Sequence, residues 1–130
     1  MPLIRVDVYE GSYSEKELKN ILDLIHKNAV ESFKIPERDR YQIVSRHTKD
    51  EMILQDTGLG FERTDKAISI QIFSRPRDKQ GKLDFYRNVT QELTEALEIG
   101  GEDILISLLE NGDSDWSFGF GKAQFETGEL

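Results

Sequence analysis

The sequence repeats one pattern of secondary structure, and this repeat limits the folds that are open to the chain. In each copy, a stretch of alternating apolar residues is followed by an amphipathic helical segment and then by a second apolar stretch. Leu3 and Ala67 begin the two copies 64 positions apart, and Phe33 and Leu97 have the same separation. A helix between two such strands is typical of a crossover between parallel strands. We therefore expect a duplicated β-α-β unit.

Four strands and two helices make up the repeat. The expected strands are Leu3–Tyr9, Tyr41–His47, Ala67–Phe73 and Ile104–Glu110. The first helix has a capping box, in which the Ser14 side chain covers a free backbone N–H and Glu17 reaches back. Its apolar stripe runs to Phe33, and Pro36 ends it. The second helix is expected at about Lys79–Ile99, with an apolar side made of Leu83, Tyr86, Val89, Leu93 and Leu97.

These elements predict an α+β fold of order β-α-β-β-α-β, with two helices on one face of a four-stranded mixed sheet. Because the helices cover only one face, a trimer or a similar assembly that packs sheet faces inward would bury the other. With 130 residues, the chain is expected to be a single domain, residues 1–130, with internal repeats at about 2–66 and 67–130.

The acidic composition excludes some classes of partner. The chain has 17 Lys and Arg against 25 Asp and Glu, a net charge of −8, so no nucleic-acid partner is expected. No apolar run is long enough to span a membrane, and the N-terminus lacks a signal-peptide pattern, so we expect no membrane partner and a cytoplasmic location. The absence of cysteine excludes disulfides, thiolate metal sites and cysteine nucleophiles.

Pro2 is the unusual residue near the N-terminus. Aminopeptidases normally remove an initiator Met that precedes a small second residue, proline included. Removal would leave Pro2 with a free secondary amine, which no other residue type can supply. The alternative is that Pro2 only begins a strand, where its missing N–H is tolerated.

Arg75 and Arg77 directly follow the strand expected at 67–73. In an extended segment they would point to the same side, and their guanidinium groups suit a carboxylate. The alternative is a solvated pair beside the start of the second helix. Because Leu3 aligns with Ala67, Pro2 belongs at the opposite end of its own strand. The two ends can meet if the units pair antiparallel, or across a subunit boundary.

The remaining candidates each have more than one interpretation. Asp39 could be a general base, or it could be paired with Arg38 or Arg40. Aromatic residues in the glycine-rich tail could wall an apolar pocket, cover the sheet or form an oligomer contact; they are Trp116, Phe118, Phe120 and Phe125. His26 and His47 lack the spacing of metal ligands, so no metal is expected, and His26 is expected to be a capped or surface residue.

Pro2, the repeat of 64 residues and the segment 74–77 together resemble the tautomerase superfamily. Further segments resemble its malonate semialdehyde decarboxylase-like branch, namely Arg38–Gln42, Asp56–Phe61, Glu110–Gly119 and Phe125–Leu130. The resemblance covers nearly the whole chain. It implies the trimeric tautomerase fold, a small oxo-acid substrate and no cofactor.

The resemblance also implies roles for individual residues. Pro2 would be the catalytic proline, and Asp39 would activate water. Arg75 and Arg77 would bind the substrate carboxylate. The pocket wall of the branch would be formed by Trp116, Phe118, Phe125 and Leu130. Phe120 stands where the resemblance leads us to expect a more basic residue. This difference concerns the identity of the substrate and does not affect the catalytic residues.

The expected activity depends on the protonation of Pro2. A cationic Pro2 would act as an acid on a 3-oxo acid, which favours decarboxylation like that of malonate semialdehyde decarboxylase, with hydration as a side activity. A neutral Pro2 would act as a base, and the alternative is keto–enol tautomerisation of 2-oxo acids such as phenylpyruvate. An alternative of another class is a non-catalytic, cytokine-like binding protein, against which the complete catalytic set argues.

Overall fold

The computed structural model describes residues 2–130, and Met1, on whose removal a free Pro2 amine depends, lies outside the described residues. The elements in chain order are β1 (Leu3–Tyr9), α1 (Glu15–Phe33), β2 (Tyr41–His47), β3 (Ile68–Ser74), α2 (Lys79–Leu97), η1 (Gly101–Asp103), β4 (Ile104–Glu110), η2 (Asp113–Asp115) and α3 (Gln124–Thr127). The strands and the two long helices lie where the sequence predicts them. The one-residue shift of β3 and the earlier end of α2 are the small differences.

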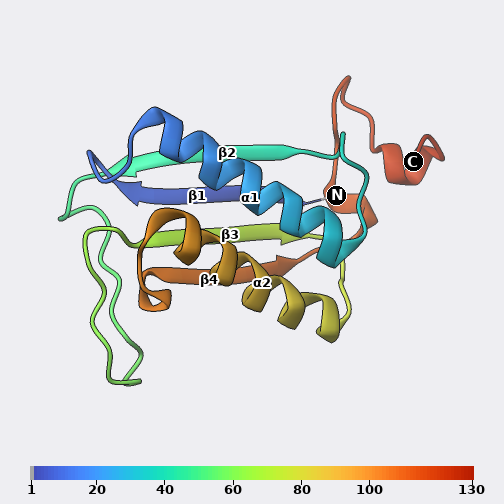
Figure 1. Ribbon diagram of the computed structural model, residues 1–130. Helices are drawn as coiled ribbons and strands as arrows, with labels where there is room; N and C mark the ends of the chain where they lie inside the picture. The colour runs from blue at the N-terminus through green and yellow to red at the C-terminus, as the bar shows by residue number, and fades with distance from the viewer. Residues whose placement is uncertain (1) are drawn as a thin grey trace.

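The four strands form one sheet in the order β2-β1-β3-β4. Strand β1 pairs parallel with β2, β3 pairs parallel with β4, and the central strands β1 and β3 run antiparallel. Helices α1 and α2 lie side by side on one face of this sheet (Figure 1). The chain therefore has the expected α+β fold, a duplicated β-α-β with two helices on a four-stranded mixed sheet.

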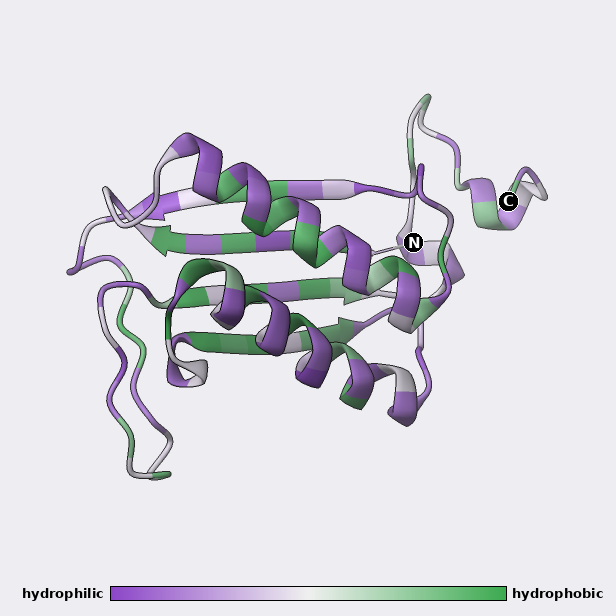
Figure 2. Cartoon of the chain, viewed as in Figure 1, coloured by the Kyte–Doolittle hydropathy of each residue, from purple (hydrophilic) through white to green (hydrophobic). Residues whose placement is uncertain are grey.

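The core lies between the two helices and the sheet. Alternation in β1 turns Ile4, Val6 and Val8 toward the helices, and each is at most 2% exposed. Ile21 and Ile25 of α1 belong to the same buried cluster. Figure 2 shows that apolar residues also lie along β3 and β4. Burying one such side chain stabilises a fold by roughly 1.5–3 kcal/mol, so this layer fixes the strands whose ends carry the predicted site.

The buried side of α2 differs from the prediction. Leu83 was expected in the core but is 44% exposed, whereas Phe85 is fully buried. The Phe85 ring stacks on Phe33 of α1 with centroids 5.1 Å apart. The fully buried line of α2 passes through Phe85, Val89 and Leu93, four residues apart, and this spacing selects Phe85 over Leu83.

The start of α2 contains Gly81, a residue type that lowers helix propensity. The Asp78 side chain caps the helix by accepting from the Gly81 N–H at 2.6 Å. A Cβ at position 81 would lie 2.8 Å from the Asp78 Oδ1 and 3.0 Å from the Ser32 carbonyl oxygen of α1. Gly81 therefore allows both the cap and the close approach of the two helices.

The second face of the sheet has a mixed surface. Tyr41 is 41% exposed, and Ile43 and Leu109 are each 44% exposed. On the same face, the His47 Nε2 lies 2.6 Å from the Asp7 Oδ1. Within residues 2–130, no helix has the length and apolar character needed to cross a membrane.

Candidate active site

Strand pairing brings Pro2 to the segment 74–77. Strands β1 and β3 are antiparallel, and Leu3 lies opposite Phe73. Pro2, one residue before β1, therefore lies at the end of the sheet where β3 finishes, and it is fully buried. The sequence left open whether these two ends meet within one chain or across subunits. The register shows that they meet within the chain.

The parallel pairing of β1 with β2 brings Asp39 to the same end. Strand β2 begins at Tyr41 beside the start of β1. Asp39 closes the preceding turn, because its N–H donates to the Pro36 carbonyl at 3.0 Å. The residue is 6% exposed, and burial raises the pKa of its carboxyl, while the positive charge of Arg77 lowers it. Asp39 is thus a buried carboxyl within the electrostatic range of Arg77.

Arg77 is held by the ends of β3 and α1. Its Nε donates to the Ser74 Oγ at 2.9 Å, and its Nη1 donates to the Phe33 carbonyl at 3.4 Å. The guanidinium carbon lies 5.7 Å from the centre of the Phe33 ring. Burial lowers the pKa of Arg77, and the charge of Arg75 lowers it further, whereas Asp39 raises it. The two arginines and Asp39 therefore form one electrostatic group.

Arg75 is held by the C-terminal tail, the segment 111–130 that follows β4. Its guanidinium carbon lies over the Phe125 ring, 3.8 Å from the ring centre, in a cation–π contact. Its Nη1 donates to the Asp113 Oδ1 at 3.1 Å. The side chain remains 38% exposed, so the N–H groups of its two terminal nitrogens, Nη1 and Nη2, can reach a carboxylate ligand. The two predicted arginines thus have different supports.

The aromatic residues of the tail form a continuous cluster. Trp116 and Phe118 stack with ring centroids 5.3 Å apart, and Phe125 meets Phe118 edge to face at 5.4 Å. The Trp116 Nε1 donates to the Asn111 Oδ1 at 2.7 Å, which ties the cluster to the end of β4. Because Phe125 also contacts Arg75, these rings lie beside the arginine as an apolar wall would.

Tyr41 joins this cluster, although the sequence analysis did not include it. Its ring lies 5.7 Å from that of Phe118. The sequence feature that could have indicated this role is the position of Tyr41, two residues after the predicted site residue Asp39. Leu130 is 58% exposed, and its N–H donates to the Gln124 carbonyl at 3.3 Å, so its place in the wall stays a prediction. Phe120 is 99% exposed, in the turn between Gly119 and Lys122.

His26 was predicted to be a capped or surface residue, and it does not lie at the surface. His26 is 7% exposed, and its Nε2 lies 2.8 Å from the Glu37 carbonyl oxygen. A contact between a helix and a loop residue eleven positions later leaves no sign in the local sequence. In the part of the chain that the structure describes, no group of three or more His, Asp and Glu residues could hold a metal ion.

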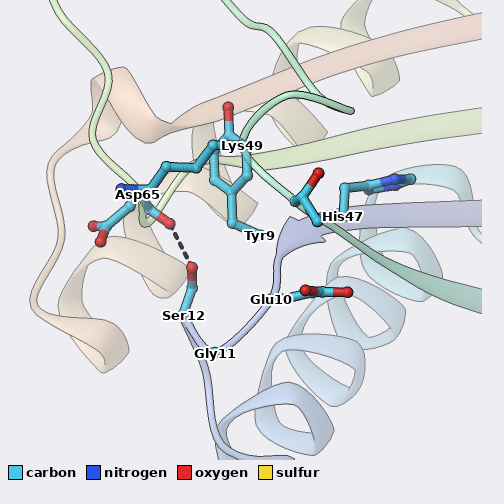
Figure 3. Close-up of a pocket in the computed structure, with 8 residues that line it drawn as sticks. Tyr9, Glu10, Gly11, Ser12, His47, Lys49 and Asp65 are labelled. Atoms are coloured by element: carbon cyan, nitrogen blue, oxygen red, sulfur yellow. Dashed lines mark hydrogen bonds between the residues drawn. The ribbon is translucent and has the colours of Figure 1, made fainter.

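A separate hollow of about 260 Å³ lies at the opposite end of β1 and β2 (Figure 3). Its lining residues are Tyr9, Glu10, Gly11, Ser12, His47, Thr48, Lys49 and Asp65. In its wall, the Ser12 hydroxyl donates to the Asp65 carbonyl at 2.6 Å. The hollow contains none of the predicted site residues, which belong to the other end of the sheet.

Sequence comparison identifies relatives over the full length of the chain. A family model described as "Tautomerase enzyme" matches residues 39–119, and another with the same description matches residues 2–62. The probable tautomerase YrdN of Bacillus subtilis (strain 168) is 44% identical over 100% of both chains. The probable tautomerase YusQ of the same organism is 33% identical over 95% of this chain and 98% of its own.

Solved structures give the same result. A malonate semialdehyde decarboxylase is 41% identical, with a TM-score of 0.92 over 98% of each chain. FG41 malonate semialdehyde decarboxylase, inhibited by 3-bromopropiolate, is 38% identical, with a TM-score of 0.91 over 98% of this chain and 97% of that one. A fused 4-OT symmetric trimer, 16% identical over 97% and 98% of the two chains, shares the fold at a TM-score of 0.77. The chain belongs to the tautomerase superfamily, in its malonate semialdehyde decarboxylase-like branch, and is an enzyme of the tautomerase or decarboxylase type.

Proposed function

We propose that this enzyme decarboxylates a small 3-oxo acid, with the Pro2 amine as the acid and with Arg75 and Arg77 as the carboxylate-binding pair. The antiparallel pairing of β1 with β3 carries the proposal, because it brings Pro2 to the end of the sheet where the segment 74–77 begins. The likeness to two malonate semialdehyde decarboxylases supports the same substrate class.

The amine of Pro2 becomes available when Met1 is removed. A free α-amino group has a pKa near ~7.7–8.0, so small electrostatic effects decide its charge at neutral pH. The two arginines and burial favour the neutral amine, whereas the nearby carboxylate of Asp39 favours the cation. In the proposed enzyme Asp39 tips this balance, and Pro2 is protonated.

The proposed reaction needs one proton and no further reactant. The protonated amine of Pro2 donates a hydrogen bond to the substrate carbonyl oxygen and polarises it. The bond between the carboxylate carbon and C2 breaks, CO2 leaves, and the electron pair of that bond forms an enolate. Pro2 then gives its proton to C2, and the amine takes a new proton from water. With malonate semialdehyde, the products are acetaldehyde and CO2.

The buried carboxylate of Asp39 also suits a second, slower reaction. As a base, it would take a proton from a water molecule that attacks C3 of a 2,3-unsaturated acid bound by Arg75 and Arg77. The π electron pair of the C=C bond then moves to C2, and protonated Pro2 gives that carbon a proton. Hydration is therefore the proposed side activity. Burial of Asp39 favours this role, because the raised pKa makes the carboxylate a stronger base.

Tautomerisation of a 2-oxo acid is the second candidate. The rings of Trp116, Phe118 and Phe125 beside Arg75 could pack against an aromatic substrate such as phenylpyruvate. In this reaction a neutral Pro2 moves a proton between C3 and the carbonyl oxygen. The two relatives from Bacillus subtilis are named probable tautomerases, which supports the same activity.

We further propose that the enzyme is a homotrimer that buries the second face of the sheet. The apolar residues Ile43 and Leu109 on this face are each 44% exposed. Replacing Ile43 by Glu should dissociate the assembly in sedimentation velocity, whereas Ile53→Glu on the exposed loop, where Ile53 is 74% exposed, should not. A wild-type monomer would contradict this proposal.

The activity test begins with the mass of the intact purified protein, which must correspond to a chain without Met1. Rates are then measured with malonate semialdehyde and with phenylpyruvate for wild type, Pro2→Ala and Arg75→Ala. Arg87→Ala is the matched control, because Arg87 is an exposed arginine of α2 paired with Asp84. Both site variants should lose at least about a hundredfold in kcat/KM, and the control should not. Inactivity of the wild type on both substrates, or full activity of Pro2→Ala, would overturn the proposal.

A further inference from the structure

His26 is a buried histidine of α1. It is 7% exposed, and its neighbours Ile25 and Ala29 are fully buried. Burying an imidazole among apolar side chains is unfavourable unless its polar atoms form hydrogen bonds. The Nε2 of His26 does so, at 2.8 Å from the Glu37 carbonyl oxygen.

The partner atom fixes where the proton lies. A carbonyl oxygen can only accept a hydrogen bond, so the Nε2 of His26 must carry the hydrogen. The bond therefore requires either the Nε2–H tautomer or the imidazolium. Either form gives a donor that points from the middle of α1 into the connection between α1 and β2.

This connection carries Asp39. Pro36, Glu37, Arg38 and Asp39 form a turn in which the Asp39 N–H donates to the Pro36 carbonyl at 3.0 Å. Glu37 is the second residue of the turn, and its carbonyl is free to accept from outside. The bond from His26 thus anchors to α1 the same turn that directs the Asp39 carboxyl toward the interior, where it is 6% exposed.

We propose that His26 is a positioning residue, which holds the turn 36–39 so that Asp39 keeps its place beside Arg77 and Pro2. The proposal rests on the proposed function of Asp39. His26 acts only through the Glu37 carbonyl and Asp39, and it does not touch the substrate. Arg77 and His26 both interact electrostatically with the Asp39 carboxyl and lower its pKa, which agrees with their shared proximity to this carboxyl.

Two substitutions separate the hydrogen bond from the packing. His26→Leu keeps the buried site filled but removes the donor. His26→Gln keeps an N–H donor at about the reach of the histidine Nε2, without the ring. Lys27→Leu is the control one position along α1, where the lysine side chain is 52% exposed and pairs with Glu92.

The first measurement needs no substrate. Hydrogen exchange of a peptide that covers residues 34–41 should be faster in His26→Leu, close to wild type in His26→Gln, and unchanged in Lys27→Leu. Thermal melting of each variant shows whether the fold is intact. Unchanged exchange in His26→Leu would overturn the proposal, and so would equal acceleration in the Leu and Gln variants.

The second measurement is steady-state kinetics with the substrate that the wild type accepts. A misplaced Asp39 should lower kcat by at least about tenfold with KM within about twofold, because the arginines that bind the carboxylate are untouched. His26→Gln should recover most of kcat. A rise in KM alone would overturn the positioning role. If the wild type is inactive, the proposed function fails, and the exchange data alone decide on the role of His26.

Discussion

The guanidinium carbon of Arg75 lies 3.8 Å from the centre of the Phe125 ring, so the end of β3 and the C-terminal tail are joined by one cation–π contact. Arg77, two residues later, instead uses the side chain of Ser74 and the carbonyl of Phe33. The two arginines can therefore be perturbed separately, one through the tail and the other through the sheet and α1.

The first prediction concerns Phe125. Phe125→Leu removes the ring beneath Arg75, and an exposed cation–π contact contributes about 0.5–1 kcal/mol. We expect KM for the oxo acid to rise by about two- to fivefold with little change in kcat. Phe120→Leu is the matched control, since Phe120 is 99% exposed. Equal kinetics for wild type and Phe125→Leu would show that the ring does not support Arg75.

The second prediction concerns the carboxylate that Arg75 binds in the free enzyme. The Asp113 Oδ1 lies 3.1 Å from the Arg75 Nη1, where it would compete with the substrate carboxylate in the proposed function. A surface ion pair contributes about 0.2–1 kcal/mol, so Asp113→Asn should lower KM by up to about fivefold at low salt. Asp50→Asn, an exposed aspartate, controls for the change in net charge. A higher KM in Asp113→Asn would mean that Asp113 orients Arg75 instead.

The third prediction concerns Asp39 and stability. Burial raises the pKa of Asp39 in the folded state. The contribution of this carboxyl to folding stability is therefore present below its unfolded-state pKa, and it is lost as pH rises through the raised folded-state pKa. At pH 7 the buried carboxylate therefore destabilises the fold. Asp39→Asn should raise Tm by a few degrees at pH 7, with a smaller difference near pH 4, while it lowers activity.

Asp56 provides the opposite case in the same melting experiment. The backbone N–H groups of Gly60 and Gly58 lower the pKa of Asp56, so its charged form stabilises the fold above its unfolded pKa. Asp56→Asn should therefore lower Tm at pH 7. A decrease in Tm for Asp39→Asn as well would contradict the assigned cost of burying Asp39.

The fourth prediction tests which residue of α2 supports the core. Phe85 is fully buried and stacks on Phe33, so Phe85→Ala should destabilise the protein by about 3–5 kcal/mol in urea unfolding. Leu83→Ala should cost less than about 1 kcal/mol, because Leu83 is 44% exposed. Similar losses of stability for the two variants would mean that Leu83 supports the core, as the sequence predicted.

The fifth prediction concerns Gly81. Helix propensity alone would make Gly81→Ala stabilising by about 1 kcal/mol. The new Cβ would instead lie 2.8 Å from the Asp78 Oδ1 and 3.0 Å from the Ser32 carbonyl oxygen, so we expect a loss of about 1–3 kcal/mol. Gly101→Ala is the control, since its Cβ would meet only the Thr90 Cγ2 at 3.7 Å. Stabilisation by Gly81→Ala would show that the helices can separate without cost.

The sequence was sufficient for the fold because local patterns encode it. The alternation in β1 and the capping box at Ser14 depend on neighbours within a few residues, and both are confirmed. The antiparallel pairing of β1 and β3 was one of two arrangements left open. The domain assignment, residues 1–130 with repeats at about 2–66 and 67–130, stays a prediction.

The features that the sequence analysis missed depend on contacts between distant segments. Phe85 is buried because Phe33 of α1 lies against it, and Leu83 would fit an amphipathic helix equally well. The burial of His26 depends on a loop carbonyl, which has no side-chain signature. Tyr41 belongs to the aromatic cluster only because the tail folds back to β2.

The two halves of the repeat place corresponding positions at opposite ends of the sheet, and the contacts at these two ends differ. An offset of 64 positions maps Asp39 onto Asp103, which is 2% exposed, and Pro2 onto Lys66. Asp103 accepts from the N–H and hydroxyl of Thr64, each at 2.7 Å, and the Lys66 ammonium lies over the Tyr13 ring. The Asp103 carboxylate is thus satisfied by contacts within the scaffold. Asp39, by contrast, keeps a carboxyl with a raised pKa at the end of the sheet where the chemistry is proposed.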